Sequence, residues 1–71
     1  MKKLNKLKEY REKSNLSKQD LAYILDITPE GVSKFETLNY NISAKYTYLL
    51  SKLYKKSMED IYIATMQEVK I

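Results

Sequence analysis

The side chains that could do chemistry in this chain are carboxylates, lysines and tyrosines, because it contains neither cysteine nor histidine. Their absence excludes disulfides, thiol chemistry and the usual general base, and it leaves carboxylates as the remaining zinc ligands. Glu59 and Asp60 form one pair of acids, but adjacent helical positions do not face each other, and acids are favourable in a first helical turn. We therefore predict that the protein is not an enzyme and holds no metal or cofactor.

Basic residues give the chain a formal charge of +4, from thirteen Lys or Arg residues against nine Asp or Glu residues. This excess favours a polyanionic partner only slightly, since lysine-rich surfaces are often merely solvated. The positions of the basic residues say more than their number. They crowd the first expected helix, and Lys18 and Lys34 lie on the second and third.

Two helix starts lie close together between residues 17 and 36 and predict a sharp corner. Ser17 is a good N-cap, and Asp20 three residues later completes a capping-box-like pair. Thr28 is a second N-cap, followed by Pro29 at the first helical position, where its missing N–H costs nothing. Because only residues 26 and 27 separate the two helices, they should cross steeply, as in a helix-turn-helix.

Hydrophobic spacing predicts three more helices around this corner. The first runs from about residue 3 to 13, the fourth from the Ser43 cap to about residue 55 or 56, and a short fifth follows the cap at Ser57. Residues 37–41 lack periodicity and read as a loop. Apolar residues at odd positions from 61 to 71 leave three alternatives for the tail: a strand, a helical extension or a frayed end.

The length of 71 residues indicates one small domain, covering residues 1–71, with too little core for a sizeable small-molecule pocket. No apolar stretch approaches the ~18 residues of a membrane-spanning helix, and no signal-peptide core follows the basic start. We expect a soluble, cytoplasmic protein without membrane contact.

The segments LKEYREKSNLSKQDLAYILDITPEGVSKFE and SAKYTYLLSKLYKKSMEDI resemble the Cro and phage-repressor type of helix-turn-helix domain, the Xre family, over about residues 4–61. The resemblance implies an all-α, lambda-repressor-like fold of five short helices, encoded by a bacterium or a phage. It also implies that Arg11 and Glu36 form a buried ion pair, as in many relatives; the alternative is two independent surface charges. The core positions of the motif are Leu21, Ala22, Leu25, Ile27, Val32 and Phe35.

For function, the resemblance implies that the helix from Thr28 to Glu36 enters the major groove of double-stranded DNA. The outward positions, expected to contact bases, are Pro29, Glu30, Gly31, Ser33 and Lys34. Those expected to contact phosphates are Ser17, Lys18, Thr28, Thr37, Asn39 and Tyr40. A solvated surface lysine is the alternative for Lys18.

Three positions depart from the family pattern. Asp26 stands where the turn usually has Gly, Glu30 puts a carboxylate on the base-reading face, and Gly31 lowers helix propensity by about 1 kcal/mol. Because Pro29 and Gly31 have no hydrogen-bonding side chain, we expect modest sequence specificity, helped by DNA shape.

The same family pairs through its fifth helix and chain end, which predicts a homodimer interface at Ile61, Tyr62, Ile63 and Met66. Packing of this segment on its own core is the alternative. The expected function is a small dimeric repressor that binds operator DNA. A different class of function is a protein-interaction module, antitoxin-like or anti-repressor-like, supported by Glu30, Gly31 and apolar Tyr23 and Ile24 at positions that are usually polar.

Overall fold

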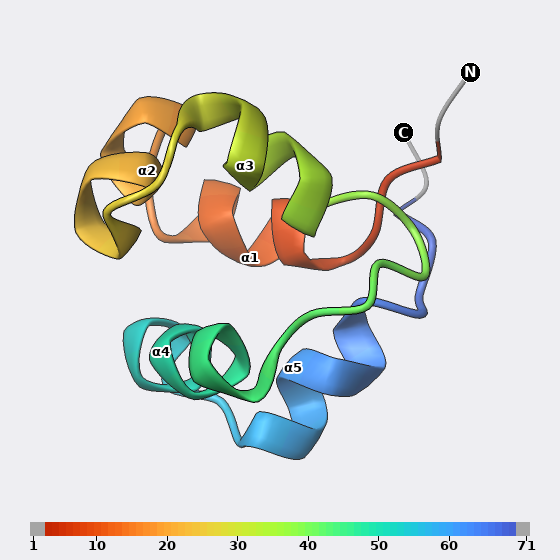
Figure 1. Ribbon diagram of the computed structural model, residues 1–71. Coiled ribbons are helices and arrows are strands. Elements are labelled where there is room, and N and C mark those ends of the chain that lie inside the picture. Colours follow the sequence, from red (N-terminus) through yellow and green to blue (C-terminus); the bar gives the residue numbers. More distant parts are fainter. Residues whose placement is uncertain (1–2, 70–71) are drawn as a thin grey trace.

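Five α-helices follow one another within residues 3–69, the part of the chain that the computed structural model describes (Figure 1). Their bounds are α1 Leu7–Lys13, α2 Lys18–Leu25, α3 Pro29–Phe35, α4 Ala44–Tyr54 and α5 Met58–Ala64. The all-α, five-helix prediction is therefore confirmed. The last two residues of the predicted tail, 70 and 71, lie outside the described range.

The corner between α2 and α3 forms through the caps that the sequence predicts. The Ser17 hydroxyl accepts from the Asp20 backbone N–H at 3.0 Å, and the Asp20 carboxylate accepts from the Ser17 N–H at 3.0 Å. Hydrogen bonding to the carboxylate from the Ser17 backbone N–H, and after it from the Ser17 side chain, holds the pKa of the Asp20 carboxyl below its ordinary value. Thr28 Oγ1 accepts from the Gly31 N–H at 3.1 Å and caps α3. Asp26 makes the turn in the left-handed conformation, with φ 57° and ψ 48°.

The helices form two layers, with α1, α2 and α3 above α4 and α5 in the view of Figure 1. The core between them consists of buried Leu7, Leu21, Ala22, Leu25, Val32, Phe35, Ile42, Leu50, Tyr54, Ile61 and Ala64. Aromatic pairs join the layers: the ring centroids of Phe35 and Tyr46 lie 5.0 Å apart, and those of Tyr10 and Tyr54 lie 5.9 Å apart. The layer that contains the α2–α3 corner thus packs against the layer formed by α4 and α5.

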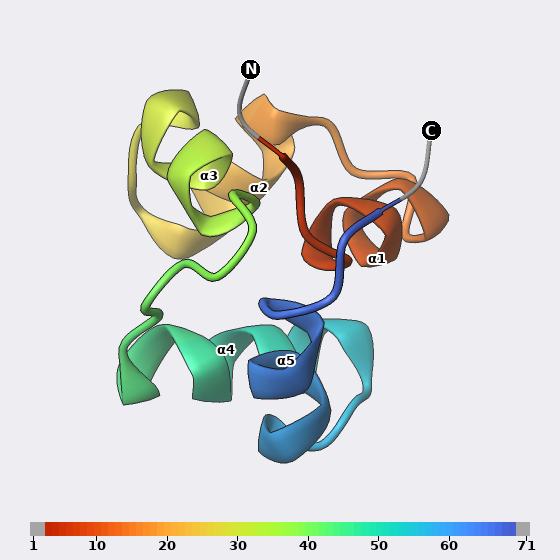
Figure 2. The same cartoon turned by 90° about the vertical axis from the view of Figure 1, so that its right-hand side faces the viewer.

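The first helix begins at Leu7 and not near residue 3, because the segment before it is extended and pairs with distant parts of the chain. Leu4 forms an antiparallel bridge with Thr37, and Asn5 forms one with Glu68. These hydrogen bonds replace those that a longer helix would make. Figure 2 shows this N-terminal segment beside the segment that follows α5.

The described part of the tail is helical at its start and contains no strand after that, only an isolated bridge. Residues 61 and 63 are helical, so a strand beginning at residue 61 is wrong. Beyond α5, Glu68 bridges to Asn5, and the Val69 N–H donates to the Leu4 carbonyl at 3.0 Å. Up to residue 69, the odd-position alternation therefore covers the last turn of α5 and this isolated bridge.

Candidate nucleic-acid interface

The exposed face of α3 carries the residues expected to read bases, although not all of them point outward. Pro29, Glu30 and Lys34 are exposed, whereas Val32 and Phe35 are buried. Gly31 is half-buried: a Cβ at this position would lie 3.4 Å from Ile27 Cδ1, so Gly31 faces the turn. Gly31 is therefore only partly exposed, because the turn packs against one side of it, and its contact with bases stays a prediction.

A shallow hollow of about 320 Å³ adjoins this face. It is lined by Leu4, Glu30, Ser33, Lys34 and Thr37. Within residues 3–69, Glu30 and Lys34 form no ion pair, so both charges are free toward solvent. Glu30 lies in the first turn of α3, where the helix dipole favours a carboxylate.

The residues expected to hold phosphates lie at helix starts and in the loop after α3. Ser17, Lys18 and Thr28 are exposed at the N-terminal ends of α2 and α3. The hydroxyl oxygens of Ser17 and Thr28 accept capping hydrogen bonds, which leaves their hydroxyl protons as donors toward an anion. Positive partial charge at helix starts favours such an anion.

The three loop residues differ in the groups that they leave available for a phosphate. Asn39 is exposed and takes φ 62°. Thr37 is half-buried, and its hydroxyl donates to the Ser33 carbonyl at 3.1 Å, so only its oxygen lone pairs and backbone remain available. Tyr40 is half-buried with its ring centroid 5.4 Å from that of Phe35. The loop is thus packed on the core, with Asn39 at its surface.

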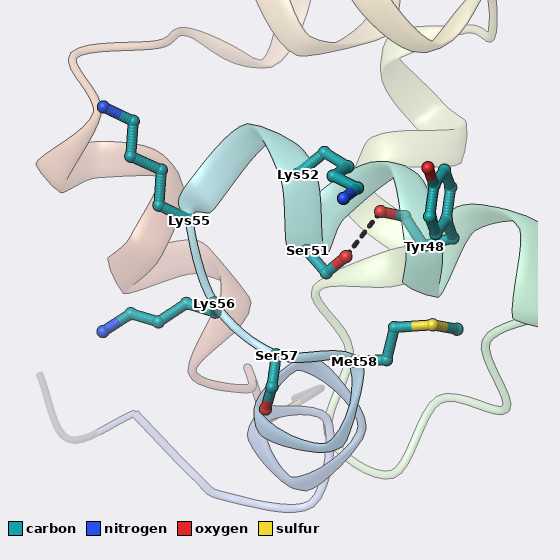
Figure 3. A pocket seen from close by; sticks show the side chains of 7 residues that line it. All are labelled: Tyr48, Ser51, Lys52, Lys55, Lys56, Ser57 and Met58. Carbon is teal, nitrogen blue, oxygen red and sulfur yellow. Dashed lines mark hydrogen bonds between the residues drawn. The ribbon is translucent and has the colours of Figure 1, made fainter.

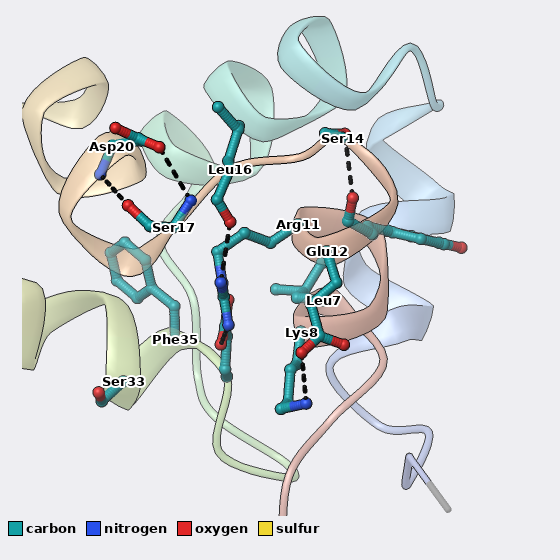
Figure 4. Close-up of polar contacts among 12 residues, drawn as sticks. Leu7, Lys8, Arg11, Glu12, Ser14, Leu16, Ser17, Asp20, Ser33 and Phe35 are labelled. Atoms are coloured by element: carbon teal, nitrogen blue, oxygen red, sulfur yellow. Dashed lines mark hydrogen bonds and ion pairs between the residues drawn. The ribbon is translucent and has the colours of Figure 1, made fainter. Parts of the chain in front are cut away.

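An ion pair fixes the end of α3 to α1. Arg11 Nε lies 2.7 Å from Glu36 Oε2, and Arg11 Nη2 lies 3.3 Å from Glu36 Oε1; their side chains are 8% and 2% exposed. Arg11 Nη1 also donates to the Leu16 carbonyl at 2.9 Å (Figure 4). The hydrogen bond to Glu36 raises the pKa of the Arg11 guanidinium. These are the two residues for which the sequence predicts a buried pair; two independent surface charges are not observed.

Comparison with known proteins identifies the architecture. A family model described as helix-turn-helix matches residues 7–61, the span from the first residue of α1 into α5. The chain belongs to the Xre family of helix-turn-helix domains. No solved structure is significantly similar to the chain.

Two archaeal relatives of this Xre-family chain carry descriptive names. An uncharacterised HTH-type transcriptional regulator of Archaeoglobus fulgidus is 30% identical over 64 residues, which cover 90% of each chain. Another protein of the same description, from Methanocaldococcus jannaschii, is 36% identical over 59 residues, 83% of this chain and 89% of its own. Both matches extend over most of the domain.

The apolar surface of this Xre-family domain differs from the expected dimer interface at one residue. Ile61 is 0% exposed and belongs to the core, so its placement in an exposed interface is wrong. Tyr62, Ile63 and Met66 are exposed. Met58 is exposed as well and, with Tyr62 and Met66, follows a spacing of four residues that the sequence reasoning missed. On α2, Tyr23 is 88% exposed and Ile24 is also exposed.

A second hollow, of about 510 Å³, lies at the corner between α4 and α5. It is lined by Tyr48, Ser51, Lys52, Lys55, Lys56, Ser57 and Met58 (Figure 3). Lys52 Nζ lies 5.3 Å from the Tyr48 ring centroid, and within residues 3–69 none of the three lysines forms an ion pair. This corner belongs to the layer opposite α3, and the lysine-rich run KLYKKSM is the sequence signal that could have found it.

Metal and membrane sites can be assessed for the described part of the chain. Residues 3–69 contain no group of three or more His, Cys, Asp or Glu side chains that could hold a metal ion. Across the same residues, no helix has the length and hydropathy required to cross a bilayer.

Proposed function

We propose that this Xre-family protein is a transcriptional regulator that binds double-stranded operator DNA as a homodimer and acts as a small repressor in the cytoplasm. The observation that carries the proposal is the exposed face of α3, with charged Glu30 and Lys34 free of ion pairs and the helix end locked by Arg11 and Glu36. The names of the two archaeal relatives, both HTH-type transcriptional regulators, support the regulatory part. Neither relative bears on the predicted bacterial or phage origin, which stays a prediction.

In this proposal, phosphate contacts anchor the protein and α3 reads the groove. Lys18 supplies a point charge at the start of α2, and Ser17, Thr28 and the loop residue Asn39 donate hydrogen bonds to phosphates. On α3, Lys34 donates to guanine acceptors, and Glu30 accepts from a cytosine amino group. Because Ser33 is half-buried and Gly31 faces the turn, few groups reach bases, so DNA shape contributes much of the specificity.

The exposed apolar side chains near the chain end are the proposed homodimer surface. Tyr62, Ile63 and Met66 remain from the predicted set, and Met58 extends them along α5. In a symmetric dimer, such a surface would place two α3 helices one DNA turn apart, about 34 Å. The fixed distance between the two α3 helices would then restrict binding to DNA with two half-sites at that spacing. Dimerisation would thus add sequence selectivity that one short α3 helix lacks.

Fluorescence anisotropy with a labelled duplex from the DNA upstream of the protein's own gene tests this function. We expect binding that weakens steeply between about 50 and 200 mM salt, since each neutralised phosphate releases counterions. Absence of binding at low salt would refute the proposal. Binding that does not change with salt would refute the phosphate-anchoring mechanism.

A protein-interaction module is the second candidate, and the exposure of Tyr23 favours it. A tyrosine that is 88% exposed beside exposed Ile24 forms an apolar patch on α2 that a partner protein could cover. The same titration separates the two functions. A module that has lost DNA binding shows no salt-dependent complex with any duplex.

A further inference from the structure

Asn5 is a completely buried polar residue, with 0% of its surface exposed, and it meets the chain just after α3. Its side-chain Nδ2 donates to the Phe35 carbonyl at 2.7 Å and to the Thr37 carbonyl at 3.0 Å. Its backbone N–H donates to the Glu36 carbonyl at 2.8 Å. The last carbonyls of a helix lack partners within the helix, so one residue satisfies three consecutive carbonyls at the end of α3.

The other end of the Asn5 side chain binds the backbone at the start of α1. Its Oδ1 accepts from the backbone N–H of Leu7, the first residue of that helix, at 2.9 Å. An amide is suited to this place because it carries donors and an acceptor on one short side chain. Asn5 therefore joins the start of α1 to the end of α3 by direct hydrogen bonds.

The loop proposed to contact phosphate is held by the same part of the structure. The Leu38 N–H donates to the Lys3 carbonyl at 2.9 Å, and the Asn39 N–H donates to the Thr65 carbonyl at 2.6 Å. The loop backbone is thus fixed on one side by the N-terminal segment and on the other by Thr65, the residue after α5. Loss of the Asn5 bonds would release the loop at Thr37, on the side nearer α3.

We propose that Asn5 is a positioning residue for DNA binding, which sets the place of the α3 end and of the phosphate-contacting loop. The inference rests on the proposed function. Arg11 holds the same helix end through the Glu36 side chain, and Asn5 holds it through the backbone. The two residues restrain different atoms, so the ion pair does not replace the Asn5 contacts.

Substitutions at Asn5 can separate its two roles. Asn5→Ser and Asn5→Asp keep a side-chain oxygen of the kind preferred at helix starts, but both lose the amide donors that reach Phe35 and Thr37. With the duplex used above, we expect each variant to bind about tenfold more weakly. We also expect the slope of log affinity against log salt to be shallower by about one phosphate contact.

Ser51→Ala is the matched control. It removes a partly buried hydrogen bond, from Ser51 Oγ to the Tyr48 carbonyl at 2.7 Å, within α4 and without touching α3 or its loop. Its melting temperature should fall while its salt slope stays that of the parent chain. All variants are compared at a temperature at which circular dichroism shows them folded. If Asn5→Asp does not fold, the binding of Asn5→Ser tests the positioning role.

Two results overturn different claims. A folded Asn5 variant that binds within twofold of the parent, with the parent's salt slope, would overturn the positioning role and leave the DNA-binding function intact. A parent chain that binds no duplex would overturn the proposed function, and this inference with it.

Discussion

At the scale of single residues, Tyr54 is unusual because its hydroxyl is buried without a partner. Among residues 3–69, Tyr54 Oη is the only buried side-chain polar atom without a hydrogen bond. An unsatisfied buried donor costs about 1–3 kcal/mol, whereas removing it with its ring kept in place is close to neutral. We predict that Tyr54→Phe leaves the free energy of unfolding unchanged or raises it by about 1 kcal/mol, measured by urea denaturation.

The result that would contradict this prediction is a loss of stability of about 1 kcal/mol or more, which would mean that the hydroxyl has a partner. Tyr10→Phe is the control for removing a phenol oxygen, since the ring of Tyr10 lies against that of Tyr54 in the same aromatic pair. Both variants keep the edge-on ring contact, so a difference between them reports on the two hydroxyls.

The same residue predicts a dependence of stability on alkaline pH. Burial, and then the charge of Glu36, raise the pKa of Tyr54 above its ordinary value of 10.0. The unfolded chain therefore releases this proton at a lower pH than the folded chain. The contribution of Tyr54 is fully present below about pH 10 and is lost as the pH rises further. Urea denaturation between pH 8 and pH 11, as rough limits, should show this loss in the parent and less of it in Tyr54→Phe.

A steeper loss in Tyr54→Phe than in the parent chain, over the same pH range, would be incompatible with this assignment. The comparison between the two chains removes the contribution of the lysines, which both share. Only the difference between the curves belongs to Tyr54.

At the scale of elements, α2 and α4 both have a C-cap other than glycine in the left-handed conformation. Asp26 ends α2 with φ 57°, and Lys55 ends α4 with φ 57°. Residues with a Cβ cost roughly 1 kcal/mol more than Gly in this conformation. Asp26→Gly and Lys55→Gly should each raise the free energy of unfolding by about 0.5–1 kcal/mol, and together by about the sum, measured by thermal or urea unfolding.

Lys52→Gly is the matched control for Lys55→Gly, because it replaces the same residue type three positions earlier, inside α4. There the backbone is helical, so Gly should lower stability by about 1 kcal/mol. Equal effects of the two lysine substitutions would contradict the conformational explanation.

The elements also show which parts of the fold were predictable. Local signals sufficed for the α2–α3 corner, because Ser17, Thr28 and Pro29 act on their own helices within a few residues. The sequence pattern places the start of α1 too early. Leu4 pairs with Thr37 and Asn5 with Glu68, and no local pattern reports pairing between residues so far apart in the chain. For the same reason the pattern of apolar residues could not reveal that one polar residue, Asn5, holds the end of α3.

The sequence likewise predicts the candidate site only in part. Helical periodicity identified Glu30 and Lys34 as outward, because Val32 and Phe35 fix the inward face. It could not show that Gly31 turns toward Ile27, which depends on the geometry of the corner. Ile61 was assigned to the surface by its place in an apolar run, but its neighbours in space, and not those in sequence, bury it.

At the scale of the whole molecule, two groups of lysines lie on separate parts of the structure. Lys18 and Lys34 belong to the helix-turn-helix, and Lys55 and Lys56 line the hollow between α4 and α5, in the other layer. General attraction between a basic protein and DNA would use both groups, whereas binding through α3 would use the first. The two groups thus provide substitutions that change the net charge equally at different places.

The central claim is that duplex DNA binds at α3, and a pair of charge reversals tests it most directly. One variant carries Lys18→Glu with Lys34→Glu, and the other carries Lys55→Glu with Lys56→Glu; both are titrated against the upstream duplex by fluorescence anisotropy at about 100 mM salt. We predict that the first weakens binding about 100-fold or more, while the second stays within about threefold of the parent. Equal losses in the two variants, or a loss confined to the second, would contradict binding at α3.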